Sequence, residues 1–219
     1  MPVTTLIGDL IGSRTSADRH ALHVRFERAL AEINDLFTPP TPMRITVGDE
    51  YQGVLASLGD ALSASLLVRL ALRPEGDIRH GIGRGDVEVL GVSPRVEDGP
   101  GWWAARAAIE RVEQAETRAA TRTLRTAYVA DVSAPAGGRP EARTTADEAA
   151  VNASLLLRDE LVTGLSQRSL SVLRGLLAGQ TQRDLAHQLG ISASAVSQRV
   201  RADGLGTILA AHELMGGLP

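Results

Sequence analysis

The sequence predicts an α+β fold in which a ferredoxin-like βαββαβ domain is followed by an all-α domain with a helix-turn-helix. Two observations support this prediction. In the first 85 residues, short apolar runs typical of strands alternate with amphipathic helical segments. From residue 146 onward, every segment with a clear pattern has helical spacing. The expected division is a first domain over residues 1–132, a linker or exposed loop over 133–145, and a second domain over 146–219.

Each element of the first domain has its own local signal. Apolar residues such as Leu22, Phe26, Leu30 and Ile33 recur at helical spacing, and a proline-rich stretch follows them and ends the helix. Short apolar runs beside Gly-Asp steps indicate strands. In chain order we expect a strand at 4–7, a helix at 16–36, a strand at 43–47, a return strand at 51–55, a helix at 60–72, a strand at 77–85 and a long helix at 100–126.

The second domain is predicted to be helical throughout. The segment at 133–145 contains Ala-Pro-Ala-Gly-Gly-Arg-Pro, a composition that favours a flexible linker or exposed loop. Beyond it, helices are expected at 146–162, 167–178, 182–189, 193–202 and 205–215.

Composition restricts the possible functions. An apolar content of 43% and a charged content of 22% are ordinary for a globular protein. The absence of cysteine excludes disulfides and thiolate metal sites, and the absence of lysine excludes a lysine base, Schiff base or phosphate-binding lysine. No apolar run is long enough for a membrane helix and the N-terminus has no secretory pattern, so we expect a cytoplasmic protein with no membrane partner. The net charge of −3 argues against wholly electrostatic binding of nucleic acid.

Two acidic steps are the most informative feature of the first domain. Asp9 follows the first predicted strand, and Asp49 and Glu50 form the turn between the second and third. Carboxylates gathered at neighbouring strand ends suit Mg²⁺ or Mn²⁺ and, through the ion, a nucleotide phosphate. In the simpler interpretation, Asp9 caps a loop and Gly48-Asp49 serves a turn. The joint occurrence of the two steps favours a metal site.

Residues 182–200 form the clearest local motif of the chain. Ala186 is small enough for two helices to cross closely, Gly190 supplies a left-handed turn, Ile191 fills the core and Ser192 caps the next helix. This pattern predicts a helix-turn-helix. The outward side chains of its second helix are Ser194, Ser197, Gln198 and Arg201, with Arg199 nearby. These five side chains are the expected DNA contacts, because their types can bond base edges and phosphates.

With the helix before it, this stretch resembles the DNA-binding units of LuxR-type regulators and of sigma-factor region 4. DNA is therefore the expected partner. Three-helix units of this kind also serve as protein-interaction modules, which is the alternative interpretation. Because symmetric pairs read DNA best, a homodimer is expected.

Four segments taken in order resemble the SatD family, and the match extends over essentially the whole chain. They are Gly8-Asp9-Leu10-Ile11-Gly12-Ser13-Arg14, Thr46-Val47-Gly48-Asp49-Glu50-Tyr51-Gln52-Gly53, Arg79-His80-Gly81-Ile82-Gly83-Arg84-Gly85 and Asp98-Gly99-Pro100-Gly101-Trp102-Trp103-Ala104-Ala105-Arg106.

More distantly, the same segments are similar to the palm domains of class III nucleotide cyclases and GGDEF proteins. That resemblance implies a palm domain whose metal ligands are Asp9 and Asp49, with Glu50 beside them, and whose cofactor is Mg²⁺ or Mn²⁺. It also implies a nucleotide as ligand. The residues that it places near the phosphates are Leu10, Ile11, Gly12 and Ser13 through their main-chain amides, and Arg14 and Arg106 through their side chains.

Two departures from the cyclase pattern bear on activity. Ile45 stands where cyclases usually have a basic residue, and Trp102 stands where they have an asparagine. These groups serve base selection and transition-state stabilisation, whose loss is costly in phosphoryl chemistry. The departures favour a palm that binds or senses over one that turns over rapidly.

A few other residues have competing interpretations. Trp102 and Trp103 could stack on a base, but anchoring the long helix on the sheet is favoured. His80 is favoured as a packed or hydrogen-bonded histidine of the fourth strand. The other histidines have no metal-ligand spacing.

The preferred hypothesis is a DNA-binding regulator with a metal- and nucleotide-binding palm as its sensor. The first alternative is a Mg²⁺- or Mn²⁺-dependent nucleotidyl cyclase or nucleotidyltransferase, for which the acidic pair argues. The second alternative is a non-catalytic interaction scaffold in which the acidic residues are structural.

Overall fold

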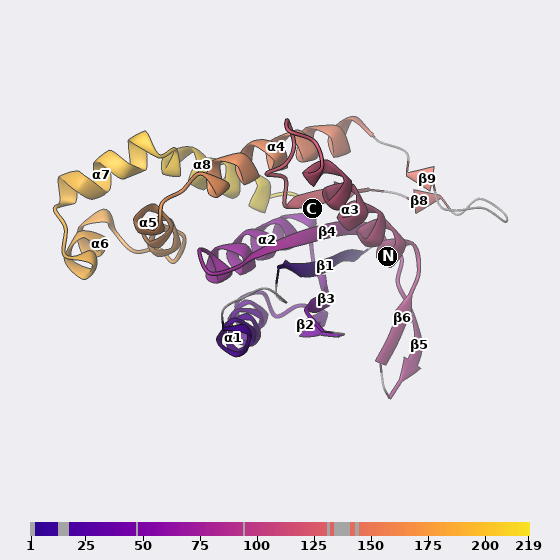
Figure 1. Ribbon diagram of the computed structural model, residues 1–219. Helices are drawn as coiled ribbons and strands as arrows, with labels where there is room; N and C mark the ends of the chain where they lie inside the picture. Colours follow the sequence, from indigo (N-terminus) through magenta and orange to yellow (C-terminus); the bar gives the residue numbers. More distant parts are fainter. Residues whose placement is uncertain are drawn as a thin grey trace.

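The computed structural model describes residues 3–12, 18–46, 48–93, 95–130, 132–133, 141–142 and 145–219. Figure 1 shows a five-stranded sheet with helices on both faces, and a helical unit at one end. In chain order the elements of the first part are β1 (Val3–Ile11), α1 (Arg19–Phe37), β2 (Thr41–Ile45), β3 (Glu50–Leu55), α2 (Leu58–Leu72), β4 (Asp77–Gly85), β5 (Glu88–Val92), β6 (Arg95–Asp98), α3 (Pro100–Glu116) and β7 (Thr126–Val129).

The second part of the chain is mainly helical. Two short strands precede it and pair with each other, and no side-chain position is described for them. The elements are β8 (Val132–Ser133), β9 (Glu141–Ala142), α4 (Ala146–Thr163), α5 (Gln167–Leu177), α6 (Gln182–Leu189), α7 (Ala193–Ala202) and α8 (Leu205–Gly216).

The sheet confirms the ferredoxin-like prediction. Its strand order is β2-β3-β1-β4-β7, and each neighbouring pair among the first four strands is antiparallel. The fifth strand, β7, was not predicted and pairs parallel to β4. All four residues of β7 are buried, so this short strand extends the core at the β4 edge of the sheet.

The two faces of the sheet have different covers. On one face, Leu6, Leu10 and Ile82 pack with residues of α1 and α2 such as Phe26 and Leu62. The predicted apolar stripe of α1 is buried there, which confirms the periodicity argument for that helix. On the other face, Ile7 and Val54 pack against Trp102, Ala105 and Ile109 of α3.

Helix α3 lies unusually close to β4 because glycines line that strand. A Cβ added to Gly81 would lie 2.2 Å from the carbonyl oxygen of Ala105, and one added to Gly83 would lie 2.3 Å from the Ala105 nitrogen. Only hydrogen fits between the two backbones at these positions. The glycine-rich exit of the fourth strand is therefore a packing surface for α3.

The predicted long helix at 100–126 is wrong in its length. Helix α3 ends at Glu116, and turns over 117–123 lead into β7. The hydroxyl of Thr121 donates to the carbonyl oxygen of Ala115, one of the groups that the helix end leaves without a helical partner. The β5–β6 hairpin was also missed. It projects from the sheet at the end opposite the helical unit (Figure 1).

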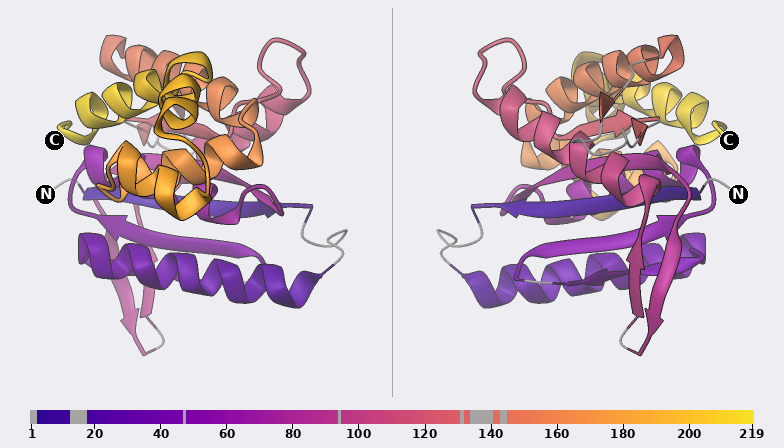
Figure 2. Two further views of the ribbon diagram at one scale, coloured as in Figure 1. Left: turned by 90° about the vertical axis from the view of Figure 1, so that its left-hand side faces the viewer. Right: turned by 90° about the vertical axis from the view of Figure 1, so that its right-hand side faces the viewer.

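Helix α2 joins the two parts of the molecule. Leu62 and Val68 belong to the core shared with the sheet, whereas Leu66 and Leu70 belong to the core of the helical unit. A helix that is buried on nearly all sides has little amphipathic pattern, which agrees with its almost wholly apolar sequence. The views in Figure 2 show the helical region resting on the side of the sheet domain, not detached from it.

Helix α4 also packs on the sheet domain. Asn152 bonds the main chain of Tyr128 in β7, with distances of 2.9 Å and 2.8 Å. Leu155 belongs to the same core as the sheet. The predicted helices of the second part agree with the structure to within one residue at each end, whereas most of the predicted linker lies outside the described residues. Within the described residues, no helix is long and apolar enough to cross a membrane.

Candidate functional site

Asp9 lies inside β1, two residues before the strand ends, and not at the strand end as predicted. In the sheet register it stands opposite Glu50 of β3 on one side and Arg79 of β4 on the other. Because Leu10 faces α1 and α2 and side chains alternate along a strand, Asp9 lies on the α3 face. The sheet thus brings together two of the predicted acidic residues and a cation, Arg79, for which no role was predicted.

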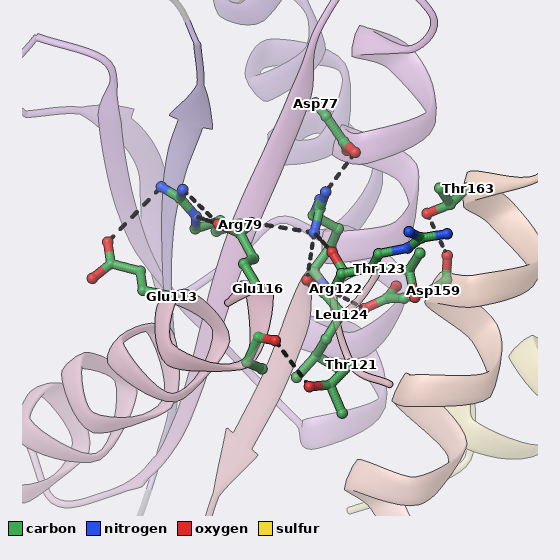
Figure 3. A network of polar contacts seen from close by, with 12 residues as sticks. Asp77, Arg79, Glu113, Glu116, Thr121, Arg122, Thr123, Leu124, Asp159 and Thr163 are labelled. Atoms are coloured by element: carbon green, nitrogen blue, oxygen red, sulfur yellow. Dashed lines mark hydrogen bonds and ion pairs between the residues drawn. The ribbon is translucent and has the colours of Figure 1, made fainter. Parts of the chain in front are cut away.

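Arg79 is the partner of Asp9. Its Nη1 lies 2.9 Å from the Asp9 carboxylate, and its Nη2 lies 2.7 Å from Glu116 at the end of α3. Figure 3 shows Arg79 between Glu116 and Glu113, the latter 3.9 Å away. The side chains of Asp9, Arg79 and Glu116 are each about one-fifth exposed, so the ion pairs among them are partly shielded from solvent.

The charges continue from Glu116 into the interior. Arg125 lies 3.1 Å from both Glu116 and Asp77, and Asp77 lies 2.8 Å from the buried Arg69. Arg69 in turn lies 3.0 Å from the fully buried Asp159 of α4. The contacts link, in order, Asp9, Arg79, Glu116, Arg125, Asp77, Arg69 and Asp159. This network ties the acidic face of the sheet to α2 and α4.

Asp49 and Glu50 lie at the turn into β3. The carbonyl oxygen of Asp49 accepts from the Leu10 amide at 3.3 Å, which joins the turn to β1. Burial and the nearby Asp49 charge raise the pKa of Asp9, although Arg79 opposes them. Asp9 and Asp49 are therefore close enough to repel each other. The Glu50 carboxylate lies 3.4 Å from Nη2 of Arg106, a side chain expected near the phosphates.

Of the acidic residues Asp9, Asp49 and Glu50, two at most are candidate ligands of one divalent ion. Within the described ranges, no three His, Cys, Asp or Glu side chains are grouped closely enough to hold a metal ion. Glu50 is paired with Arg106 and Asp9 with Arg79, and Asp49 lies near Asp9 at the turn. Asp9 and Asp49 are the candidate ligands, and an ion between them would compete with Arg79 for Asp9. Mg²⁺ is often held by one or two carboxylates, with water and substrate phosphates completing its shell. The donor set is compatible with that kind of site and not with a metal cage made of protein ligands alone.

A cavity of about 420 Å³ adjoins the turn. Its lining includes Gly48 and Asp49 and, from the start of α1, Arg19, His20 and His23, whereas Asp9 does not line it. A carboxylate and basic side chains around one cavity are suited to a phosphate with its metal ion. The position of α1 relative to the turn could not be read from the sequence, so these basic residues were not predicted.

The residues predicted to contact phosphate differ in their surroundings. The Leu10 amide is occupied by Asp49, and Ile11 continues β1 opposite Asp77. Both residues belong to the sheet, and the Leu10 amide already has a main-chain partner. A contact between these amides and a phosphate stays a prediction. Gly12 has φ of +69°, whereas Ser13 and Arg14 lie outside the described residues. Arg106 is half-exposed and lies beside the acidic turn, where its contact with a phosphate stays a prediction.

The glycine of the first motif has a packing role. A Cβ on Gly8 would lie 2.0 Å from the ring of Tyr51, so only glycine leaves room for that ring. Tyr51 lies edge-on to Phe26 and to His80, whose ring centroid is 5.9 Å away. His80 is fully buried, as expected for a packed histidine, and within the described part of the chain neither ring nitrogen has a hydrogen-bond partner. Burial first, and then the charges of Arg158 and Arg69, lower its pKa to about 3.

Trp102 anchors α3 on the sheet, which is the interpretation that the sequence favoured. It is buried against Ile7 and Val54, so it has no free face on which to stack a base. The Nε1 of Trp103 donates to Asp98 at 2.8 Å. The departure from the cyclase pattern at position 102 is therefore a packing residue in this fold.

The helix-turn-helix has the predicted local chemistry. Thr181 and Asp184 form a capping box at the start of α6, and Gly190 adopts φ of +64° at its end. The Ile191 amide donates to the carbonyl oxygen of Ala186, and the Ser192 side chain accepts from the Ala195 amide at the start of α7. These contacts set the angle between the two helices.

The second helix of the motif, α7, presents an exposed polar face. Ser194, Gln198 and Arg201 are exposed, and Ser197 is half-buried. Arg199 differs from the prediction because its Nη1 lies 3.4 Å from the Ser169 hydroxyl and 4.0 Å from Asp203. It lies toward α5 and helps to hold the unit together. Arg183 at the start of α6 is exposed beside the motif and was not among the predicted contacts.

Residues 178–202 match a family of winged helix-turn-helix DNA-binding domains. No curated protein sequence matches the chain.

Three solved structures are similar to the chain. A bacterial light-regulated adenylyl cyclase has 16% identity and a TM-score of 0.40, with 52% of this chain and 72% of that one covered. The guanylyl cyclase Cya2 has 16% identity and a TM-score of 0.38, with 52% and 70% covered. A regulator of polyketide synthase expression from Bifidobacterium adolescentis has 14% identity and a TM-score of 0.27, with 99% and 85% covered.

The sheet domain matches one protein family. Residues 3–132 match the SatD family, and this range contains the whole sheet, the acidic turn and α3. The predicted resemblance is confirmed, and the chain belongs to the SatD family.

Proposed function

We propose that the protein is a cytoplasmic DNA-binding regulator whose sheet domain senses a nucleotide bound with Mg²⁺ or Mn²⁺. The observation that carries the proposal is the α6–α7 unit, a complete helix-turn-helix with an exposed polar face on its second helix. Ser194, Gln198 and Arg201 are side chains of the kinds that bond base edges and phosphates in the major groove.

The test of DNA binding uses the full chain and a pool of random duplexes. Sequences retained by the protein are amplified and reselected, and affinity is then measured on an enriched duplex. The double substitution Gln198→Ala and Arg201→Ala should weaken binding by about tenfold or more, since each specific base contact contributes roughly 1–3 kcal/mol. Arg118→Ala is the control because it removes an exposed arginine from the sheet domain. The absence of any enrichment would contradict DNA reading.

A homodimer is part of the proposal. One copy of the motif is only slightly basic, so a pair of motifs would be needed for tight binding. The surface that we propose for pairing is on α4 and α8, where Leu157, Leu161 and Leu214 are exposed. Leu157 and Leu161 are one turn apart on α4, and α8 contains no arginine or lysine. This surface adjoins the helix-turn-helix, so a two-fold axis there would place the two motifs side by side.

Light scattering during gel filtration tests the dimer. Replacing Leu157 and Leu161 by serine should shift the protein to a monomer. Val92→Ser on the β5–β6 hairpin is the control, because Val92 is 84% exposed at the opposite end of the molecule. A monomeric wild-type protein would contradict the dimer. If only Val92→Ser disrupts the dimer, the interface lies on the β5–β6 hairpin and not on α4 and α8.

The sensor part of the proposal has two supports. Asp9 and Asp49 are close enough for Asp49 to raise the pKa of Asp9, a repulsion that a divalent cation would relieve. The cavity next to Asp49 also contains Arg19, His20 and His23, which suit phosphate oxygens. In the proposed complex Asp9 and Asp49 hold the ion, and the basic side chains orient the phosphate. The ion would supply charge neutralisation between carboxylates and phosphate.

Thermal unfolding with Mn²⁺ and each nucleoside triphosphate tests the sensor. One triphosphate should raise the melting temperature only when Mn²⁺ is present, and Asp9→Ala combined with Asp49→Ala should abolish the shift. Asp35→Ala combined with Asp147→Ala is the charge-matched control, since both residues are exposed elsewhere. A shift that persists without Asp9 and Asp49 would contradict the assignment. Release of pyrophosphate in the same samples would indicate an enzyme and not a sensor.

A further inference from the structure

A second cavity lies where the sheet domain meets the helical unit. It has a volume of about 500 Å³, within the range of roughly 300–1,000 Å³ usual for small-molecule sites. Its walls come from α1, α2 and α5. It is separate from the cavity beside Asp49, with which it shares no lining residue.

The walls of this cavity are mainly apolar. Leu36 from α1, Leu67 and Leu70 from α2, and Leu177 from α5 are among the residues that line it. Leu36 is 65% exposed, although it is a large apolar side chain. Covering such surface is favourable by about 25 cal/mol per Å². The walls therefore favour an apolar ligand group.

One cation, Arg174 of α5, is among the residues that line the cavity. Its Nε donates to the Leu70 carbonyl oxygen at 2.7 Å, and its Nη2 donates to the carbonyl oxygen of Arg73. Both bonds hold the guanidinium at the end of α2. Among the described residues, no carboxylate lies within ion-pairing distance of Arg174, and Glu32, the acidic residue of the lining, is paired with Arg28 at 2.8 Å.

The charge of Arg174 is therefore only partly compensated. Burial lowers its pKa, the nearby charge of Glu75 raises it, and Arg25 lowers it further. A half-buried guanidinium with neutral carbonyl partners gains more from an anion than an exposed arginine would, because it is partly shielded from water. One cation in the lining of an apolar cavity matches a single negative charge better than a phosphate dianion.

We propose that this cavity binds a small carboxylic acid with an apolar chain, its carboxylate at Arg174 and its chain along the leucines of α1, α2 and α5. Such a ligand would bridge the sheet domain and the first helix of the helix-turn-helix unit. It would thereby favour one placement of α5 relative to α1. An effect on DNA affinity depends on the proposed function, whereas binding itself does not.

The test uses octanoate as the probe, with octanol and octylamine as neutral and cationic analogues of the same chain length. Calorimetry and thermal unfolding are carried out on the full chain without DNA. Octanoate should bind saturably and at least about tenfold more tightly than octanol, since a hydrogen bond to a charged group contributes roughly 1.5–3 kcal/mol. Octylamine should not bind. Equal binding of octanoate and octanol would overturn the role of Arg174.

Substitutions locate the site. Ala71→Leu places a larger side chain in the cavity without changing Arg174 and should abolish octanoate binding. Ala31→Leu is the matched control because Ala31 is exposed on α1 and does not line the cavity. No saturable binding, or binding that Ala71→Leu leaves intact, would overturn the proposal. If the wild-type protein binds octanoate but does not bind DNA, the proposed function is contradicted and the proposed ligand of this cavity is not.

Discussion

His80 should make the folded state sensitive to acid. Its ring is fully buried, and its pKa is about 3 compared with an ordinary value of 6.5. Burial and the charges of Arg158 and Arg69 disfavour the protonated ring in the folded state. The unfolded chain binds this proton near pH 6.5, so it binds more protons than the folded chain between pH 6.5 and pH 3. Stability due to His80 is therefore complete above pH 6.5 and falls as the pH drops toward 3.

The size of this effect follows from the two pKa values. Between pH 7 and pH 4, protonation of His80 in the unfolded state should remove about 3 kcal/mol of stability. That is a large part of the roughly 5–15 kcal/mol that stabilises an ordinary domain. Replacement by leucine removes the titrating group from the core. It should leave stability at pH 7 within about 1.5 kcal/mol, because the volumes are similar.

Urea unfolding at pH 7 and pH 4 measures the effect. His80→Leu should lose about 3 kcal/mol less than the wild-type protein between these two pH values. The same substitution at His187, an exposed residue of α6, is the control and should lose as much as the wild type. Other titrating groups are common to all three proteins and cancel in the comparison. If His80→Leu and the wild type lose the same stability, the buried neutral histidine does not govern the acid response.

Three further predictions concern stability and are read from urea unfolding at pH 7. Asp159→Ala should lower the free energy of unfolding by about 3–5 kcal/mol, because it leaves two main-chain amides without a partner and removes one of the two carboxylates paired with buried Arg69. The substitution of its exposed neighbour, Glu160→Ala, should lower it by less than about 1 kcal/mol; similar losses would refute the role of the network. Gly81→Ala should lower the free energy of unfolding by about 1–3 kcal/mol or more, because the added methyl group clashes with α3. On α8, the methyl group of Gly206→Ala would lie 3.8 Å from its nearest neighbour, Val200, so this substitution should be neutral or stabilising. Thr181→Ala should lower the free energy of unfolding by about 1 kcal/mol, because the capping box of α6 is lost. An unchanged free energy of unfolding would show that the cap is dispensable.

The elements that could be predicted are those with a local signal. Helix α1 has apolar side chains at helical spacing, and α6 and α7 are bounded by a capping box, a left-handed glycine and a capping serine. Strand β7 has only four residues, and its pairing with β4 depends on a contact about 45 residues away in the chain. The β5–β6 hairpin was missed because its apolar residues are exposed, so alternation with polar residues is weak there.

Only those residues of the candidate site that have a local signal in the sequence could be predicted. Asp9, Asp49 and Glu50 could be recognised from their positions beside strands, and the sheet register does bring Asp9 and Glu50 together. Arg79 could not be assigned to Asp9, because the two residues are 70 positions apart and meet only through the pairing of β1 with β4. Arg199 was expected to be exposed on its helix, but its contact with Ser169 depends on how α5 packs.

The most direct test of the account measures DNA affinity with and without the sensor's ligand. Fluorescence anisotropy on an enriched duplex is recorded for the full chain alone, with Mn²⁺, and with Mn²⁺ and the stabilising triphosphate. If the sheet domain controls the helix-turn-helix, the dissociation constant should change by about fivefold or more, and Asp9→Ala with Asp49→Ala should remove the change. An affinity for DNA that is the same in all three conditions, with the ligand at saturation, would contradict a sensing role for the sheet domain.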